Sequence, residues 1–299
     1  MAKKADVAEE ITAKNCVFDG SGEFRIADAP TSLGVDRDRR IEMEGQTEKN
    51  LLKMGELQDR LYADGREGLV ILFQAMDAAG KDSTIKRVMG AFNPQGVSVH
   101  SFKQPTSTEL AHDYLWRAEC VMPPRGSIAV FNRSYYEDVL VARVHHLEEG
   151  YKMPARCTED GPDAFYRRRY RQIRDFEERC YEEGYRLVKV FLNVGLDEQK
   201  ERFLERIDNP AKNWKFSSGD LAERKLWPAY MDAYERTINE TASKHAPWYV
   251  IPADQKWVTR LLVSQAVLKA LKDIDPHYPE MPADQRANLA ACREQLMSE

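Results

Sequence analysis

"FQAMDAAGKDSTIK", residues 73–86, is the stretch of sequence that decides the fold. An apolar run leads into a tight turn, and a segment that can form a helix follows it. In that arrangement backbone N–H groups and the helix start hold phosphate, and the usual motif is G-x-x-x-x-G-K-[ST]. Gly80 and Lys81 are in register with this motif. Ala75, however, replaces its first glycine, and Asp82 replaces the Ser or Thr that binds magnesium.

Further apolar segments alternate with helical patterns along the chain. We expect strands at residues 69–74, 97–102, 127–132, 185–194 and 248–253. We expect helices at residues 36–62, 107–121 and 163–183, and from the last strand to Ile274. Continuous apolar runs are typical of strands that are buried on both faces of a parallel sheet. The pattern therefore predicts an α/β fold with a doubly wound, five-stranded parallel sheet of the P-loop type.

The chain shows no internal repeat and no linker that would divide this domain. We expect an irregular N-terminal extension at 1–35, a single domain at 36–274 with a lid at about 198–225, and a peripheral tail at 275–299.

The composition is that of an ordinary globular protein. Hydrophobic residues make up 42% of the 299, and no stretch approaches the ~20 apolar residues that cross a bilayer. The net charge of -5 argues against a general nucleic-acid binder, because such proteins carry a basic excess. The 5 cysteines never form a C-x-x-C pair, which is typical of reduced thiols without a structural zinc motif. We therefore expect a cytoplasmic protein whose partners are neither membranes nor nucleic acids.

The loop supplies the groups that phosphate chemistry requires. Lys81 is expected to act as a point charge between the donor and acceptor phosphates. The backbone and side chains around it are expected to contact the same anion. The residues assigned to phosphate in this segment are Ala78, Ala79, Gly80, Lys81, Asp82, Ser83 and Lys86.

Two carboxylates in a phosphate loop need an explanation. Asp77 becomes a useful ligand if Mg²⁺ lies between it and the phosphates, since Mg²⁺ prefers one or two carboxylates plus phosphate oxygens. An Asx-type turn or a helix N-cap is the alternative, and it suits Asp82 better because that residue opens the helix. General base catalysis by Asp77 would help an alcohol acceptor. A phosphate acceptor, with a second pKa of about 6, needs no base, and Asp77 would then only bind metal and position groups.

The segment "SIAVFNRSYYEDVLVARVHH" forms the second part of the expected site. Asn132 ends a predicted strand at the sheet edge where ligands bind, but its neutral amide is a weak metal partner. Arg133 beside it offers a guanidinium fork that suits phosphate. Glu137 and Asp138 follow within a turn, close enough to reach the cleft. On its residue type alone, Glu137 would be an ordinary solvated helix residue.

Residues 198–225 have the properties of a lid. Arg202 and Arg206 lie four apart, so they share one helix face, and Lys212 and Lys215 follow in a loop. A basic helix and loop can close over phosphates, exclude water and supply charge to the transition state.

An exposed charged helix face is the alternative to a lid. The acidic residues Glu198, Glu201 and Glu205 stand where they can pair with the arginines of this helix. Asp220 and Glu223 are expected to cap the helix that follows.

The remaining candidate groups have simpler interpretations. His145 and His146 lack a carboxylate or cysteine set at metal spacing, and we expect no zinc role for them. The aromatic residues Phe102, Tyr114 and Trp116 are expected in the core and not as platforms for a nucleotide base.

Three separated stretches together resemble the family 2 polyphosphate kinases. They are "LQDRLYADGREGLVILFQAMDAAGKDSTIKRVMGAFNPQGVSVHSFKQPT" (57–106), "FNRSYYEDVLVARVH" (131–145) and "RFLERIDNPAKNWKF" (202–216). The resemblance spans roughly residues 50–272. It implies a thymidylate-kinase-like fold with a helical lid, and phosphate transfer between inorganic polyphosphate and nucleotides with Mg²⁺, or Mn²⁺ in its place.

The resemblance also implies roles for individual residues. Asp77 and Lys81 match the loop residues of the family, and Arg133 matches the arginine of its second motif. Arg202, Arg206 and Lys215 fall in its lid.

The family divides into subclasses by acceptor, and the segment around Glu137 is similar to the subclass that phosphorylates both AMP and ADP. An acid at 137 and asparagine at 132 are the features that carry this similarity. They imply that Glu137 orients the monophosphate acceptor or its metal.

The sequence thus predicts a polyphosphate:nucleotide phosphotransferase that raises AMP to ADP and ADP to ATP. The assigned residues are Asp77, Lys81, Arg133 and Glu137 for catalysis, Asp77 and Glu137 for metal, Asn132, Glu137 and Asp138 for the nucleotide, and Arg202, Arg206, Lys212 and Lys215 for polyphosphate. An ATP-dependent nucleoside monophosphate kinase and an inactive nucleotide-binding scaffold are the alternatives. The resemblance implies a homodimer or homotetramer.

Overall fold

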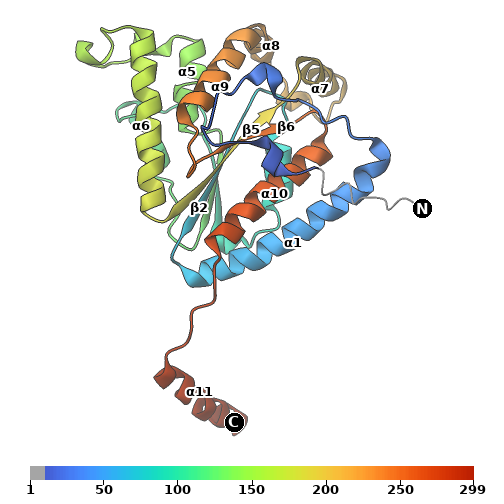
Figure 1. Ribbon diagram of the computed structural model, residues 1–299, viewed down its shortest axis with the longest axis vertical. Coiled ribbons are helices and arrows are strands. Elements are labelled where there is room, and N and C mark those ends of the chain that lie inside the picture. Colours follow the sequence, from blue (N-terminus) through green and yellow to red (C-terminus); the bar gives the residue numbers. More distant parts are fainter. Residues whose placement is uncertain (1–10) are drawn as a thin grey trace.

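A computed structural model describes residues 11–299, and a six-stranded sheet forms its centre (Figure 1). The strand order is β1-β6-β5-β2-β4-β3. The strands are β1 (Val17–Phe18), β2 (Gly68–Ala75), β3 (Val97–Ser101), β4 (Ile128–Asn132), β5 (Tyr185–Asn193) and β6 (Trp248–Pro252). The five predicted strands are confirmed, and they pair in parallel.

The prediction of five strands was nevertheless incomplete. Strand β1 pairs antiparallel with β6 at the edge of the sheet, inside the segment that was expected to be irregular. A strand of 2 residues is too short to show any periodicity in the sequence.

Helices connect the strands and cover the sheet. The α-helices are α1 (Arg40–Asp64), α2 (Lys81–Met89), α3 (Ser107–Leu110), α4 (Trp116–Glu119), α5 (Val141–Val144), α6 (Pro162–Glu182), α7 (Leu196–Asp208), α8 (Ser218–Lys225), α9 (Trp227–Thr241), α10 (Lys256–Ile274) and α11 (Ala283–Met297). Short 3-10 helices are η1 (Ala13–Cys16), η2 (Ile26–Asp28), η3 (Arg37–Arg39), η4 (Pro94–Gly96), η5 (Tyr135–Asp138), η6 (Leu147–Gly150), η7 (Ala155–Cys157) and η8 (Asn213–Lys215).

The single helix predicted at 107–121 is wrong. Two four-residue helices, α3 and α4, replace it. A capping box between Thr106 and Glu109 starts α3, and the Asp113 side chain accepts a hydrogen bond from the Leu115 N–H in the turn between the helices. Such local bonds from Asp to the backbone compete with a continuous helix.

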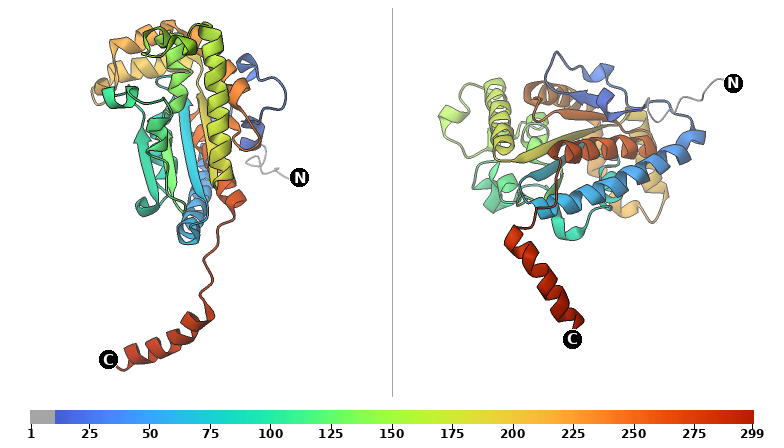
Figure 2. Two further views of the ribbon diagram at one scale, coloured as in Figure 1. Left: turned by 90° about the vertical axis from the view of Figure 1, so that its left-hand side faces the viewer. Right: turned by 60° about the horizontal axis from the view of Figure 1, so that its bottom comes forward.

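The helices form two layers around the sheet (Figures 1 and 2). On one face α10 contacts both α1 and α2, and on the other α6 packs against α9. Central strand β2 is buried along its whole length, and its apolar side chains on both faces make the core. This is why that strand shows a continuous apolar run without alternation.

A buried ion pair ties the strand layer to the segment that follows β4. Lys189 of β5 and Glu177 of α6 lie 2.6 Å apart and are almost fully buried. The hydroxyl groups of Tyr135 and Tyr136 in η5 donate to Glu177 at 2.8 and 2.7 Å. Burial lowers the pKa of Lys189, and the charge of Glu177 opposes that effect. Because breaking a buried pair is costly, this network holds η5 firmly in place.

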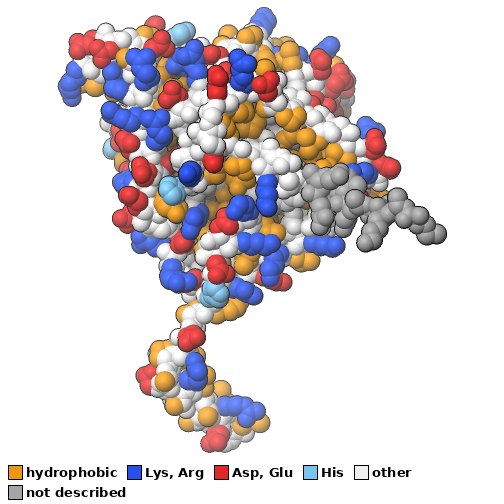
Figure 3. Space-filling model, viewed as in Figure 1, with side chains coloured by type: hydrophobic (Ala, Val, Ile, Leu, Met, Phe, Trp, Pro, Cys, Tyr) orange, Lys and Arg blue, Asp and Glu red, His pale blue; other side chains and the backbone are white. Residues whose placement is uncertain are grey.

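The two ends of the described chain differ. Residues after 10 are mostly irregular but attached to the domain, since the Ala13 N–H donates to Gln265 at 2.8 Å and the Phe24 N–H donates to Asn239 at 2.8 Å. The first ten residues, part of the expected extension, lie outside the described ones. Helix α11 stands away from the body with no buried residue, and apolar side chains are visible along it (Figure 3).

Among the described residues, no helix combines the length and apolar character that crossing a membrane requires.

Candidate active site

The candidate site lies at the carboxyl ends of β2 and β4. These strands are neighbours, with Phe73 paired to Asn132, and the Arg133 N–H donates to the Phe73 carbonyl at 3.0 Å. Helix α2, which follows β2, packs against α10, whereas α6, the long helix after β4, packs against α9 on the other face, and a crevice opens where such connections diverge. A cleft of about 1030 Å³ occupies this position. The fold therefore brings the two predicted motifs to one edge of the sheet.

The phosphate loop keeps its shape without the first glycine. Ala75 is still the last residue of β2, where extended backbone accepts any side chain. The turn itself uses left-handed backbone at Ala78 (φ 62) and at Gly80 (φ 97), which precedes α2. Left-handed backbone is costly at a residue other than glycine and is found where surrounding contacts enforce it.

Arg202 supplies those contacts. Its Nη1 donates to the carbonyls of Ala78 and Ala79 at 3.0 and 2.7 Å, and its Nη2 donates to those of Ala253 and Asp254 at 2.6 and 3.0 Å. Its Nε donates to Glu198 at 2.7 Å. The donors of Arg202 are thus engaged by protein atoms. Arg202 lines the cleft but uses its donors to position the loop, so its contact with polyphosphate stays a prediction.

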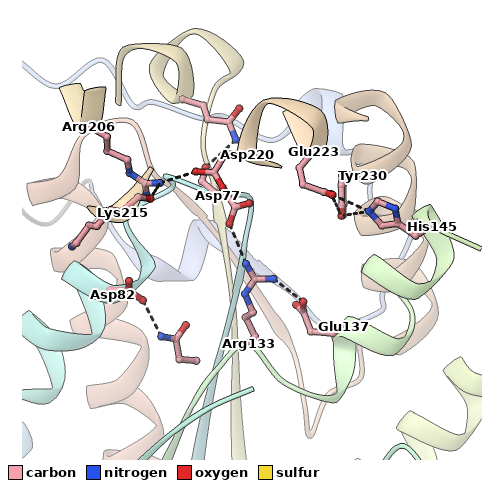
Figure 4. A network of polar contacts seen from close by, with 12 residues as sticks. Asp77, Asp82, Arg133, Glu137, His145, Arg206, Lys215, Asp220, Glu223 and Tyr230 are labelled. Carbon is pink, nitrogen blue, oxygen red and sulfur yellow. Dashed lines mark hydrogen bonds and ion pairs between the residues drawn. The ribbon is translucent and has the colours of Figure 1, made fainter. Parts of the chain in front are cut away.

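Arg133 clamps two of the predicted catalytic carboxylates (Figure 4). Its Nη2 lies 3.0 Å from Asp77 Oδ1, and its Nη1 lies 2.9 Å from Glu137 Oε2. The charge of Glu137, and then that of Asp77, raises the pKa of Arg133 despite its partial burial. Arg133 itself has left-handed backbone (φ 63), so its orientation depends on these contacts.

Glu137 is fixed on both sides and is not a solvated helix residue. With its amide oriented to satisfy its neighbours, Gln74 donates to Glu137 Oε1 at 2.8 Å and accepts from Ser134. The other oxygen of Glu137 is held by Arg133. Gln74 ends the apolar run that predicted β2, and its polar side chain inside that buried strand was a signal that sequence reasoning did not use.

Lys81 is a cation of the phosphate loop that no carboxylate holds. Within residues 11–299, its ammonium makes no hydrogen bond and no ion pair. Burial, together with the charge of Arg133, lowers the pKa of Lys81 to about 8, while Glu137 and Asp77 oppose the shift. An ammonium that is partly buried and unpaired will gain more than a surface lysine from a phosphate.

Asp82 and Asn132 pair with each other. The Asn132 amide donates to Asp82 Oδ1 at 2.9 Å. The capping interpretation of Asp82 is wrong, because Gly80 takes the N-cap position and no side chain caps the helix. A carboxylate in the first turn still interacts favourably with the helix dipole. The pair connects the two strand ends across the floor of the cleft.

The lid side carries the basic residues. Arg206 Nη1 donates to the Lys215 carbonyl at 3.2 Å and lies 3.4 Å from Asp220 Oδ2. Lys212 pairs with Glu205. The cleft is lined by these basic residues and by one that sequence reasoning missed: Arg206, Lys212, Lys215 and Lys256.

Asp220 has a different role from the one predicted. Ser217 caps α8 by accepting from the Gly219 N–H, so the expected capping pair of Asp220 and Glu223 is wrong. Figure 4 places the Asp220 side chain between Arg206 and Asp77. Burial and the charge of Asp77 raise the pKa of Asp220.

Lys86 does not reach the cleft. It lines a separate groove between α1 and α2, whereas Ser83 lines both the groove and the cleft. The prediction that Lys86 contacts phosphate in the active site is therefore not supported by its position. One further turn of helix α2 carries its side chain away from the loop.

The opposite side of the cleft has a more apolar lining than the lid side. Its wall combines one carboxylate with apolar and aromatic side chains, namely Phe102, Asp138, Val141, Ala142, Leu147 and Tyr151. Burial raises the pKa of Asp138 to about 6. Phe102 is buried as predicted. Lys103, Gln104 and Arg117 also line the cleft and were not predicted, although the position of 103–104 directly after a strand end was a usable signal.

The residues present suit a divalent metal. Asp77 and Glu137 are held by one guanidinium, and Asp220 lies beside Asp77 (Figure 4). Arg133 takes only one oxygen of Asp77. Carboxylate oxygens beside a phosphate site are the ligands that Mg²⁺ and Mn²⁺ prefer, and without a cation they would repel the substrate.

Known proteins of one family match most of the chain. The model of the family described as "Polyphosphate kinase 2 (PPK2)" matches residues 37–279. The ADP-polyphosphate phosphotransferase of Rhodopseudomonas palustris is 48% identical over 246 residues, 82% of this chain and 84% of that protein. The AMP/ADP-polyphosphate phosphotransferase of Meiothermus ruber is 42% identical over 262 residues, 88% and 93% of the two chains. The crystal structure of polyphosphate kinase 2 from Arthrobacter aurescens TC1 has a TM-score of 0.83 at 38% identity, and the match covers 94% of this chain and 97% of that one.

Proposed function

The chain belongs to the polyphosphate kinase 2 family of phosphotransferases, and we propose that it transfers the terminal phosphate of polyphosphate to AMP and to ADP. The observation that carries the proposal is the cluster of Asp77, Arg133 and Glu137 beside the unpaired Lys81. The names of the two relatives supply the acceptors. Successive transfers convert AMP to ADP and ADP to ATP.

The donor end of the cleft suits polyphosphate better than a nucleotide. It is lined by lysine and arginine from the lid and from α10, which match a polymer that carries a negative charge on each unit. In the described part of the chain, the aromatic side chains that line the cleft are Phe102 and Tyr151, and both lie on the nucleotide side. In the same described part, the exposed Trp214 of the lid does not line the cleft, so the base of a donor ATP would find no aromatic surface inside it there.

Binding of polyphosphate would exchange ion pairs within the cleft. Arg206 is paired with Asp220, and Lys212 with Glu205, so a phosphate that takes these cations releases their carboxylates. The released carboxylates leave more uncompensated negative charge beside Asp77, and this charge favours the binding of divalent cations. Metal and polyphosphate should therefore bind cooperatively.

Mg²⁺, with Mn²⁺ as its substitute, would be held by Asp77 and Glu137 and would neutralise phosphate charge when bound. The other tasks fall to the chain itself. Lys81 and the loop N–H groups contact the transferred phosphoryl group, and Arg133 keeps both carboxylates in place. The acceptor phosphate is already an anion near neutral pH, since its second pKa is about 6, so no side chain has to remove a proton.

Glu137 would distinguish the two acceptors. It stands on η5, directly before Asp138 in the wall of the nucleotide pocket, and its position is fixed by Arg133 and Gln74. A fixed carboxylate there can orient the metal or the water shell of a monophosphate, which is shorter by one phosphate than ADP. We also propose a cytoplasmic location, where AMP and ADP are available, and a homodimer or homotetramer as the family resemblance implies.

One assay separates this function from its alternatives. The full chain is incubated with AMP, Mg²⁺ and long-chain polyphosphate in the absence of ATP, and the nucleotides are separated by chromatography. We expect ADP first and ATP later, and no product when polyphosphate is omitted. Product formed only when ATP replaces polyphosphate would identify a nucleoside monophosphate kinase. No product with either donor would identify an inactive scaffold.

A further inference from the structure

A group of potential metal ligands lies outside the cleft, on the short helix η6. His146, Glu148 and Glu149 each place one ligand atom within 4.8 Å of the others. The His146 Nδ1 and the Glu148 Oε1 are 3.7 Å apart, too far for a hydrogen bond. Two atoms that bind one cation at about 2.1 Å are separated by a distance of this size when the angle at the metal is near that of a tetrahedron or slightly wider.

One oxygen of Glu148 has no partner, although the side chain is buried. Only 6% of the Glu148 side chain is exposed. Its Oε2 accepts a hydrogen bond from the Tyr166 hydroxyl at 2.5 Å, whereas its Oε1 has no hydrogen-bond partner among residues 11–299. No lysine or arginine of that part of the chain forms an ion pair with it. Burying a carboxylate without a partner is costly, and a bound ion is one of the few explanations for such an atom.

We propose that His146, Glu148 and Glu149 bind one divalent transition-metal ion such as Zn²⁺, Mn²⁺ or Co²⁺. An imidazole with two carboxylates suits these ions, whereas Mg²⁺ prefers oxygen ligands alone. This donor set separates the site from Asp77 and Glu137 in the cleft, which offer only oxygen. Waters complete the coordination, because His146 and Glu149 lie at the surface.

The site lies where it can stiffen the wall of the cleft. Its neighbours in sequence, His145 and Leu147, both line the cleft. His145 Nε2 lies 3.0 Å from Glu223 of the lid helix α8, whose carboxylate also accepts from the Tyr230 hydroxyl (Figure 4). An ion on the other side of His145 would hold η6 against α6 through Tyr166 and Glu148.

The sequence did not predict this group. His145 and His146 were expected to have no zinc role, because no carboxylate or cysteine set at metal spacing was recognised beside them. The left-handed backbone of His146 (φ 51) and the 3-10 turn after it bring the three side chains together.

Calorimetric titration of the full chain with ZnCl₂, repeated with CoCl₂, tests the proposal. Several millimolar Mg²⁺ keeps the cleft carboxylates occupied. We expect one equivalent of Zn²⁺ at micromolar affinity, and an absorption band in the visible range when Co²⁺ is used. His146→Ala and Glu149→Gln should each weaken this binding by about tenfold or more. Neither variant should alter phosphate transfer in Mg²⁺ alone.

His277→Ala is the matched control, because His277 lies 3.8 Å from Asp275 but has neither a third ligand nor a buried free oxygen. It should bind Zn²⁺ as the parent does. Binding weaker than millimolar in the parent, or equal binding in His146→Ala and the parent, would overturn the proposal. Because metal binding is measured without polyphosphate, this result is independent of the proposed phosphate transfer.

Discussion

Arg202 and Arg206 lie four residues apart on helix α7, yet the two ends of that helix belong to different regions of the molecule. Arg202 is 5% exposed and holds four backbone carbonyls of the phosphate loop and the β6–α10 turn. Arg206 is 23% exposed, and its partners are one carbonyl and one long ion pair within the lid. From these contacts we infer a fixed wall of the cleft at one end of the helix and a movable wall at the other.

The difference indicates which charged groups of the site are fixed and which can exchange their partners. Groups of the fixed wall have their geometry determined by backbone contacts, so a ligand cannot change their partners at low cost. Groups of the lid are paired side chain to side chain near the surface, where each pair contributes less than about 1 kcal/mol. Such pairs can be exchanged for phosphate. Four predictions test this division, in order of expected effect.

Replacement of Lys81, the unpaired cation of the phosphate loop, should have the largest effect on catalysis. Lys81→Ala should lower kcat by about 1000-fold or more, since the transferred phosphoryl group loses a desolvated charge that water cannot replace. Asp77→Asn should be equally severe. Steady-state assays with ADP and polyphosphate measure the loss, and thermal unfolding should show that the fold survives.

Lys86→Ala is the matched control for Lys81→Ala. Both lysines belong to helix α2, but Lys86 lies in the groove between α1 and α2, outside the cleft. Its replacement should leave kcat within about twofold of the parent on the physical argument that exposed charges outside a site contribute little. Near-normal turnover in Lys81→Ala would contradict the assigned site.

The two arginines of α7 should separate by stability and activity. Arg202→Ala should reduce the free energy of unfolding by about 3–5 kcal/mol, because buried carbonyls lose their donors. Arg206→Ala should change stability by less than about 1 kcal/mol but lower kcat/KM for polyphosphate by about 100-fold. Urea unfolding and steady-state kinetics provide the two measurements. If both variants lose activity and keep full stability, the division into a fixed and a movable wall is wrong.

Replacing the acceptor-side carboxylate should give a smaller and selective effect. Glu137→Asn should reduce kcat/KM for AMP about tenfold more than for ADP, on the scale of one lost charged contact. The comparison requires both acceptors at the same polyphosphate concentration. Equal losses with AMP and ADP would refute a role for Glu137 in orienting the monophosphate.

Proton uptake at Lys81 is the smallest expected effect. Its pKa of about 8 lies below the ordinary lysine value of 10.5, so the free protein is partly deprotonated there above pH 8. Bound phosphate favours the charged form and should raise this pKa, so binding takes up a fraction of a proton at pH 8–9 and weakens as pH rises.

Calorimetry in two buffers of different ionisation enthalpy would measure this uptake. Lys81→Ala should abolish it, whereas Arg206→Ala should retain it. The lowered pKa of Lys81 also affects stability. Between pH 8 and 10.5 Lys81 is more fully protonated in the unfolded chain than in the folded one, so its contribution to the free energy of unfolding rises with pH. Uptake that persists in Lys81→Ala would assign the proton to another group.

The parallel strands could be predicted because each is a continuous apolar run, and buried parallel strands need no alternation. The two-residue strand β1 could not, since it has no period, and the broken helix at 107–121 depended on local side-chain bonds that compete with the helical pattern. In the site, Asp77, Lys81, Arg133 and Glu137 were predicted from motifs and resemblance, and the fold brings them to one edge of the sheet. Lys256 was missed as a site residue because no motif contains it. Asp220 was expected only to cap a helix, and Gln74 was taken only as the end of a buried strand.

The sequence alone determined the strand, loop and helix that carry Asp77 and Lys81, because a continuous apolar run must be buried and a glycine permits the left-handed turn before the helix. Only the tertiary structure decided which charged side chains are free to meet a substrate. Arg202 and Arg206 are equivalent in any helical pattern, and Glu137 looks like a surface residue. Their partners come from segments distant in sequence, and a partner, far more than residue type, sets what a charge in a protein can bind.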